Sequence, residues 1–202
     1  MKKYLFLTLV FLTLSFQGLG QEVYENKKFY FSMQQPNKWF IANNKELLDN
    51  LNKIELTEES LAKFVSDSKE EILLTGFYKY NPKTKTGLIP TIQIRVRANK
   101  TKNFQSFKSD LIKSSKSFNK YFEDFGFIEE PKEIEISGIK SVVFVFQFTM
   151  KTQYNQILKV RSRAYAIPQK SYFFQINFTD GQTEEDCTKE FDELVKTIKI
   201  GK

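Results

Sequence analysis

The sequence predicts an α+β fold in which a central antiparallel sheet of about six or seven strands has helices packed on both faces. Three observations predict it. The second half of the chain holds four consecutive strand-like segments, joined by short turns. Two earlier alternating segments flank a loop of turn-forming residues, and separate stretches show the three-to-four-residue apolar spacing of amphipathic helices. Short connections between strands favour antiparallel neighbours.

The first half of the chain supplies the following elements. A first strand is expected from Val23 to Met33, and residues 43–67 show helical spacing with one break. Residues 72–80 and 90–98 are expected to pair as a hairpin across a polar loop. Residues 103–121 carry phenylalanines and a leucine at helical spacing, which predicts an amphipathic helix lying on one face of the sheet.

The second half of the chain is predicted to be a meander of strands closed by a helix. The four expected strands span residues 132–137, 141–150, 157–167 and 171–179. The second of these is apolar on both faces, which places it inside the sheet with both faces covered. A closing helix is expected after a cap at Thr183 and Asp186, with Cys187 and Phe191 on its apolar side.

Residues 1–20 have the three-part layout of a secretory signal peptide. Met1 to Lys3 is cationic, Tyr4 to Phe16 is almost continuously apolar, and small residues precede an expected cleavage after Gly20. The apolar run is shorter than the roughly 20 residues that span a bilayer as a helix. We therefore expect a single domain over residues 21–202, exported to the periplasm or the extracellular space, with no permanent membrane span.

Composition excludes several classes of enzyme. The chain has no histidine and one cysteine, so the usual base of Ser-His-Asp and Cys-His catalysis is missing, as are most zinc ligand sets. No Gly-rich phosphate loop or calcium-loop spacing is present. We predict no cofactor, no metal and no catalytic residue. The formal net charge of +7 is moderate and comes without an RNA-binding motif, so nucleic acid is not an expected partner.

The candidate binding residues are two Arg-x-Arg pairs, Arg95 with Arg97 and Arg161 with Arg163, each inside a predicted strand. Residues two apart on a strand project to the same side. If both pairs share a face of the sheet, four guanidinium groups form a basic patch, extended by Lys159, that can hold carboxylates or phosphates. Lys100 and Lys102 are expected to extend the same patch.

A structural role for the arginines is the alternative. Glu133 and Glu135 alternate with isoleucines and could supply cross-strand ion pairs to the arginines. Two further features have a functional and a structural interpretation. Trp39 and Phe40 could form an aromatic binding surface or plug one end of the sheet. Cys187 could be a reactive thiol, but its place on an apolar stripe favours burial.

Several adjacent acidic residues leave one catalytic alternative open. A pair of carboxylates can hydrolyse a glycoside without histidine. The acidic runs lie near the ends of predicted elements, where helix capping and solubility also account for them. A carboxylate-dependent hydrolase acting on envelope glycans is therefore the alternative function.

The order of elements resembles the PsbP-like family. The resemblance covers about Tyr24 to Ile200 and is carried by Pro36 and Trp39 after the first strand, the Gly138 turn before an aromatic-rich strand, and the closing helix. It implies an α/β/α sandwich, and it implies a binding or assembly role, since family members include an extrinsic subunit of the photosynthetic oxygen-evolving complex and a partner of a nuclear import GTPase. Metal contacts that use histidine in plant members cannot be carried over to this chain.

These observations together predict an exported, non-catalytic binding or assembly protein of the bacterial cell envelope. Its expected partner is an acidic envelope protein, glycan or lipid headgroup that contacts a basic strand face.

Overall fold

The computed structural model describes residues 22–42, 63, 71–152, 155–183 and 185–201. Its main body is a seven-stranded sheet in the order β3-β4-β5-β9-β8-β7-β6, in which all neighbours are antiparallel. The strands of this sheet are β3 (Phe40–Ala42), β4 (Glu71–Tyr78), β5 (Thr91–Ala98), β6 (Glu123–Ile136), β7 (Ile139–Lys151), β8 (Ile157–Pro168) and β9 (Tyr172–Gly181).

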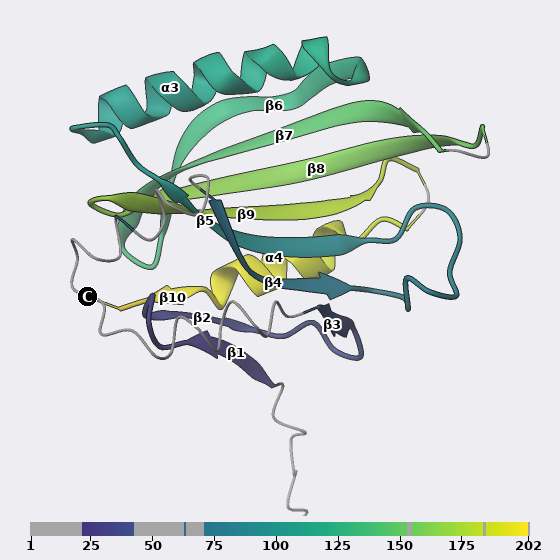
Figure 1. Ribbon diagram of the computed structural model, residues 1–202, viewed down its shortest axis with the longest axis horizontal. Helices are drawn as coiled ribbons and strands as arrows, with labels where there is room; N and C mark the ends of the chain where they lie inside the picture. Colours follow the sequence, from purple (N-terminus) through teal and green to yellow (C-terminus); the bar gives the residue numbers. More distant parts are fainter. Residues whose placement is uncertain (1–21, 43–62, 64–70, 153–154, 184, 202) are drawn as a thin grey trace, which may run out of the picture.

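Different elements cover the two faces of this sheet (Figure 1). Helix α3 (Phe104–Lys116), continued by the short 3-10 helix η1 (Ser117–Lys120), lies on one side, which we call the α3 face. The other side, the α4 face, carries α4 (Thr188–Lys196) and a three-stranded sheet. The small sheet has the order β1-β2-β10 and consists of β1 (Val23–Asn26), β2 (Phe31–Gln34) and β10 (Lys199–Ile200).

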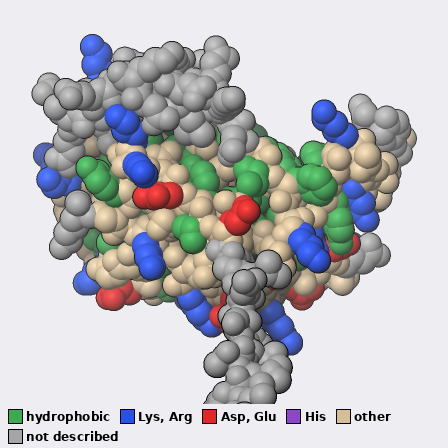
Figure 2. Space-filling model, turned by 90° about the horizontal axis from the view of Figure 1, so that it is seen from below, with side chains coloured by type: hydrophobic (Ala, Val, Ile, Leu, Met, Phe, Trp, Pro, Cys, Tyr) green, Lys and Arg blue, Asp and Glu red, His purple; other side chains and the backbone are tan. Residues whose placement is uncertain are grey.

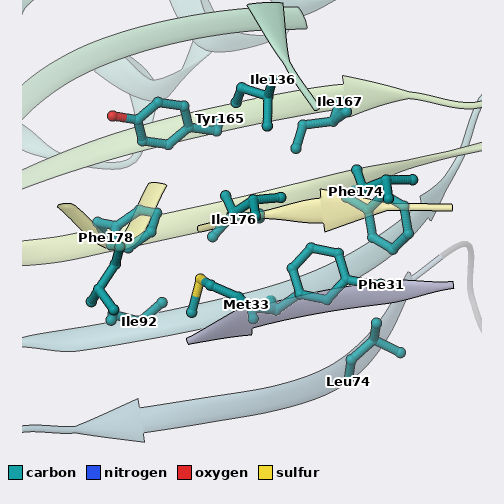
Figure 3. Close-up of a cluster of buried hydrophobic side chains, with 14 of the residues drawn as sticks. Phe31, Met33, Leu74, Ile92, Ile136, Tyr165, Ile167, Phe174, Ile176 and Phe178 are labelled. Carbon is teal, nitrogen blue, oxygen red and sulfur yellow. The ribbon is translucent and has the colours of Figure 1, made fainter. Parts of the chain in front are cut away.

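The main core lies between the large sheet and the elements on the α4 face (Figure 3). Alternate residues of β9 point into it, so Phe174 packs against Phe31 of the small sheet at 5.1 Å between ring centroids. Phe178 contacts Phe191 of α4 at the same centroid distance. Burial of several such rings accounts for much of the stability of a domain of this size.

The α3 face carries two smaller apolar clusters. Phe107 of α3 packs edge-on against Phe173 of β9, with ring centroids 5.2 Å apart. The second cluster consists of rings from η1, from the start of β6 and from the residues between them, which cover the phenylalanines of β7. The ring centroids of Phe122 and Phe148 are 4.3 Å apart. Asn103 caps α3, because its side-chain oxygen accepts a hydrogen bond from the Ser106 backbone N–H at 2.9 Å.

The prediction of an antiparallel sheet with helices on both faces is confirmed, as are the hairpin of β4 and β5, helix α3 and the four-strand meander. Two expectations about the bounds of elements were wrong. The single strand expected from Val23 to Met33 is a hairpin, in which Tyr30 has a positive φ of 51° at the turn. Strand β6 begins at Glu123, before the expected 132, and its pairing shifts register several times. Strands β3 and β10 were not anticipated.

The closing helix starts at Thr188, so the cap expected from Thr183 and Asp186 is not found. Asp186 accepts a hydrogen bond from the Thr188 N–H at 2.8 Å, just before the helix begins. The expected helical segment 43–67 lies outside the described residues, apart from Lys63, which is helical. The expected signal peptide lies outside them as well.

Candidate functional site

The two arginine pairs lie on opposite faces of the large sheet. Arg95 is directly opposite Gln175, and Gln175 is opposite Ala166, which belongs to the apolar cluster under α3. Arg163 is opposite Phe178, which points into the core on the α4 face. Directly paired residues share a face and residues at odd spacing do not. The single patch of four guanidinium groups considered from the sequence therefore does not form.

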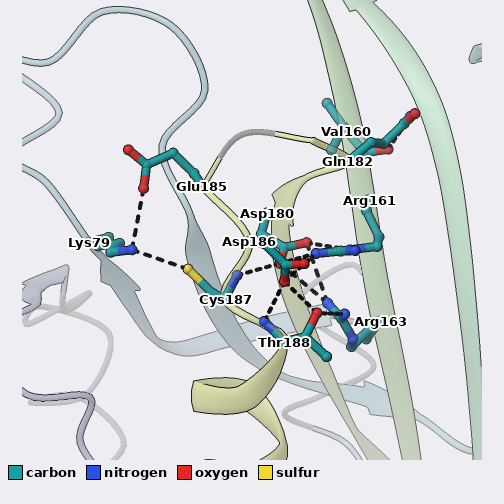
Figure 4. A network of polar contacts seen from close by, with 10 residues as sticks. All are labelled: Lys79, Val160, Arg161, Arg163, Asp180, Gln182, Glu185, Asp186, Cys187 and Thr188. Carbon is teal, nitrogen blue, oxygen red and sulfur yellow. Dashed lines mark hydrogen bonds and ion pairs between the residues drawn. The ribbon is translucent and has the colours of Figure 1, made fainter.

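Arg161 and Arg163 converge on one buried carboxylate (Figure 4). The side chain of Asp180 has 0% exposure. Arg161 donates to it from Nε at 2.9 Å and from Nη2 at 2.7 Å, and Arg163 donates from Nη1 at 3.3 Å. The backbone N–H of Cys187 donates to the same carboxylate at 2.9 Å. Such charge-assisted, bidentate contacts fix the geometry of the two strands firmly.

A second carboxylate ties this network to the start of α4. Asp186 accepts hydrogen bonds from Arg161 Nη2 at 2.7 Å and from the backbone and hydroxyl of Thr188. The Thr188 hydroxyl also accepts from Arg163. Hydrogen bonds from Thr188, followed by the Arg161 contact, lower the pKa of Asp186 to about 2. Two guanidinium groups therefore meet two carboxylates, and the network joins β8, β9 and α4.

Sequence reasoning did not identify Asp180, although a signal was present. In β9, Phe174, Ile176 and Phe178 occupy alternate inward positions, and Asp180 continues that series. Counting back from the predicted turn at residues 168–170 would have placed Asp180 opposite Arg161. An acidic residue at an inward position opposite an arginine is a strong indication of a buried ion pair.

Glu133 and Glu135 are not the partners of the arginines. Strand β7 separates β6 from β8, so these glutamates are not adjacent to Arg161 or Arg163 in the sheet. Glu133 instead accepts a hydrogen bond from Lys108 of α3 at 2.9 Å.

Arg95 and Arg97 have fewer charged partners, and Arg95 also donates to Gln93 at 3.0 Å. Both contact Glu71 of β4, and Arg97 also donates to Gln175 at 2.9 Å. The Arg97 side chain is 45% exposed. It lines a hollow of about 250 Å³ beside α3, together with Lys100. One carboxylate therefore serves two guanidinium groups here, and part of their positive charge faces solvent.

The stretch that contains this pair concentrates the positive charge of the chain. Between Arg95 and Lys120 there are eight Lys and Arg residues and one Asp, a net charge of +7, which equals the formal net charge of all 202 residues. Six of the eight are exposed, and we call them the basic layer: Arg97, Lys100, Lys102, Lys113, Lys116 and Lys120.

The basic layer has little internal compensation. Within the described residues, Lys102, Lys113, Lys116 and Lys120 form no ion pair. Lys113 and Lys116 lie in the last turn of α3, where the helix dipole favours a cation. On the opposite side of the molecule, by contrast, acidic and basic side chains are mixed (Figure 2). Among the described residues, most side chains of the basic layer therefore carry positive charge without an ion-pair partner.

A groove of about 470 Å³ lies on the α4 face, between strands β6 to β8 and α4. We call it the β8 groove, since Arg161, Arg163 and Tyr165 of β8 line it. Its acidic residues are Glu129 of β6 and Asp192 of α4, and both are exposed. Glu129 forms an ion pair with Lys132.

Lys159 lies two positions before Arg161 on β8 and shares its face, but it takes no part in the network around Asp180 and does not line the β8 groove. It lines a different hollow of about 640 Å³, formed with the loop that precedes β5 and with residues after β9. That hollow also contains Lys85 and Glu185, so its charges are mixed.

The aromatic pair and the cysteine have mainly structural surroundings. Trp39 packs on Phe191 of α4 with ring centroids 6.1 Å apart, whereas Phe40 is 47% exposed. Cys187 is buried, as its position predicted, and burial raises the pKa of its thiol despite a contact with Lys79 at 3.5 Å. A neutral thiol is a poor nucleophile.

No group of three or more Cys, Asp or Glu side chains in the described part of the chain could hold a metal ion. Among the helices of that part, none combines the length and apolar character needed to cross a membrane.

Comparison with known proteins defines the class of fold. No family model and no curated protein matches the chain. Among solved structures, cyanobacterial PsbP from Synechocystis matches with a TM-score of 0.54 and 8% identity, covering 89% of this chain and 92% of that one. LpqN of Mycobacterium tuberculosis, described as involved in cell envelope biogenesis, matches with a TM-score of 0.50 and 11% identity, covering 85% and 83%. The fold is PsbP-like, as the resemblance implied.

Proposed function

We propose that this protein is an exported, non-catalytic binding protein of the cell envelope, and that it recognises an acidic partner through the basic layer. The observation that carries the proposal is the location of the charge. Arg97 and the exposed lysines of and around α3 place six positively charged side chains in one stretch of the chain, in which Asp110 is the acidic residue. A surface of one sign attracts partners of the opposite sign and speeds their association.

Two further observations support the compartment and the class. Residues 1–20 have the layout of a secretory signal peptide. A structure that shares the fold, LpqN, is itself described as taking part in cell envelope biogenesis. Fold alone does not define function, so the argument for binding rests on the basic layer.

The alternative of a carboxylate-dependent hydrolase gains no support from the β8 groove. Such enzymes keep one carboxyl group in an apolar enclosure, where it can act as a general acid. Glu129 and Asp192 are both exposed, and Glu129 pairs with Lys132. Neither carboxyl group has the required surroundings.

The test removes charge from the basic layer without changing its packing. The variant Lys113→Gln/Lys116→Gln/Lys120→Gln is compared with Lys140→Gln/Lys151→Gln/Lys199→Gln, which loses the same charge from exposed positions on β7 and β10. Two probes separate the sources of acidic groups: immobilised heparin for a glycan, and phosphatidylglycerol vesicles for a lipid surface.

We expect the first variant to elute from heparin at lower salt than the control, or to lose roughly 1 kcal/mol of vesicle affinity per lysine. Equal weakening of both variants on both probes would show that overall charge, and not the basic layer, controls binding.

A further inference from the structure

The β8 groove lies on the opposite face of the sheet from the basic layer, and the function proposed above does not use it. Its volume of about 470 Å³ is within the range of pockets that hold small molecules. Its lining combines two kinds of surface. Val143 and Val145 of β7 are apolar, as are Ile128 and Ile134 of β6, whereas β8 contributes hydrogen-bonding side chains.

Tyr165 is the first of these polar side chains. It is only 8% exposed, and its hydroxyl makes no hydrogen bond within the described residues. The ring points its oxygen away from the apolar side chains Ile136 and Ile167 (Figure 3). Burial, and then the charge of Asp192, raises the pKa of Tyr165 to about 12, so the hydroxyl keeps its proton at neutral pH. The hydroxyl oxygen is not enclosed, because Tyr165 lines the groove, and it can therefore donate a hydrogen bond to a ligand or to water there.

The arginines supply further donors. Arg161 uses Nε and Nη2 in the network with Asp180 and Asp186, and its Nη1 forms no hydrogen bond within the described residues. Arg163 uses both terminal nitrogens, and its Nε is likewise unbonded there. Both side chains line the groove, and the network holds them in fixed positions. Together with Tyr165 they offer preorganised donors to an acceptor.

The charges of the groove decide which acceptor fits. Asp180 and Asp186 neutralise the two guanidinium groups, and Glu129 neutralises Lys132. The remaining charge on the lining is the carboxylate of Asp192. An anionic ligand is therefore repelled by Asp192 and finds no positive charge that is not already paired. An uncharged oxygen can accept the same hydrogen bonds without this electrostatic repulsion.

We infer that the β8 groove binds a small uncharged molecule in which a hydrogen-bond acceptor is attached to an apolar chain. The acceptor contacts Tyr165 and the unbonded arginine nitrogens, and the chain lies on Val143 and Val145. This site is independent of the basic layer, so either one can fail without the other.

Three probes of equal length but different charge test the inference: octanamide, octanoate and octylammonium. Each is titrated into the ¹⁵N-labelled protein, and amide chemical shifts report both affinity and location. Octanamide is expected to bind most tightly and to shift residues of β7, β8 and the start of α4. Tighter binding of octanoate or octylammonium, or shifts confined to other regions, would overturn the inference.

Variants then test the individual contacts. Tyr165→Phe should weaken octanamide binding roughly fivefold, the worth of one hydrogen bond between uncharged groups. Tyr24→Phe is the matched control, because this tyrosine also has a largely buried ring but its hydroxyl donates to the Leu74 carbonyl, outside the groove. Equal affinities in Tyr165→Phe and the control would contradict the assignment of the hydroxyl.

A change of charge at Asp192, which lines the groove, tests the selection against anionic ligands independently. Asp192 is exposed on α4, so Asp192→Asn should leave the fold intact. It should strengthen octanoate binding about two- to fivefold, as expected for removal of one exposed repulsive charge, and leave octanamide almost unchanged. Unchanged octanoate affinity would show that Asp192 does not govern charge selection in the groove.

Discussion

The two Arg-x-Arg pairs have the same sequence pattern and different surroundings. Arg161 and Arg163 are largely buried and share the fully enclosed carboxylate of Asp180, and Arg161 also pairs with Asp186. Arg95 and Arg97 are more exposed and share one carboxylate, that of Glu71. The first pair joins three elements of the fold, whereas the second lies at the edge of the basic layer. The same motif therefore has two different roles. The acidic residues that neighbouring strands place beside the arginines decide whether the pair is used within the fold or can contact a partner.

The largest effect on the free energy of unfolding is expected when the Asp180 carboxylate, which Arg161 and Arg163 share, is removed. Asp180→Ala leaves two buried guanidinium groups without their central partner, so we expect a loss of about 3–5 kcal/mol in the free energy of unfolding. Urea denaturation followed by circular dichroism measures it. Asp110→Ala, an exposed helical position, serves as the control and should change little. A loss below about 1 kcal/mol for Asp180→Ala would show that the network is dispensable.

The second carboxylate of the network predicts a dependence on pH. The pKa of Asp186 is about 2 in the folded protein and 3.8 ordinarily. Because the folded value is lower, the ionised group stabilises the fold above about pH 4, and this stabilisation is lost as the pH falls toward 2. The side chain is half exposed, so the expected contribution is on the order of 1 kcal/mol after solvent screening.

Comparison with Asp186→Asn isolates this contribution. The difference in unfolding free energy between the protein and the variant should shrink between pH 5 and pH 2.5. A constant difference across that range would assign the effect of the variant to packing and not to charge.

The smallest effect on stability is expected at the exposed pair. Glu71→Gln removes the carboxylate that Arg95 and Arg97 share, at a cost of at most about 1 kcal/mol, because the ion pairs are partly exposed. The same change should increase retention on heparin, since both guanidinium groups lose their counter-charge. Earlier elution than the unmodified protein would mean that these arginines do not belong to the binding surface.

Much of the fold could be predicted from local patterns. The strand-like patterns of β7, β8 and β9 and the helical spacing of Phe104, Phe107 and Leu111 defined elements that the structure confirms. The β1–β2 hairpin was missed because its turn, with Tyr30 at positive φ, interrupts an alternation that continues on both sides. Strand β10 is two residues long and forms only by pairing with β2, so no local pattern could indicate it.

The candidate site was harder to predict, because it depends on which strands are neighbours. Alternation placed Arg95 beside Arg97 and Arg161 beside Arg163, but it could not show that the pairs occupy opposite faces. The partner Asp180 could have been found from the register of the β8–β9 hairpin, which the short turn already limited. The β8 groove combines residues from β6, β7, β8 and α4, and only the assembled fold brings them together.

The most direct measurement compares urea denaturation of two double variants, Arg161→Gln/Arg163→Gln and Arg95→Gln/Arg97→Gln. The first leaves the enclosed carboxylate of Asp180 without its cations, and it should lose about 3–5 kcal/mol of unfolding free energy. The second should lose less than about 1 kcal/mol. Equal losses for the two variants would contradict the separation of a structural pair from an available one.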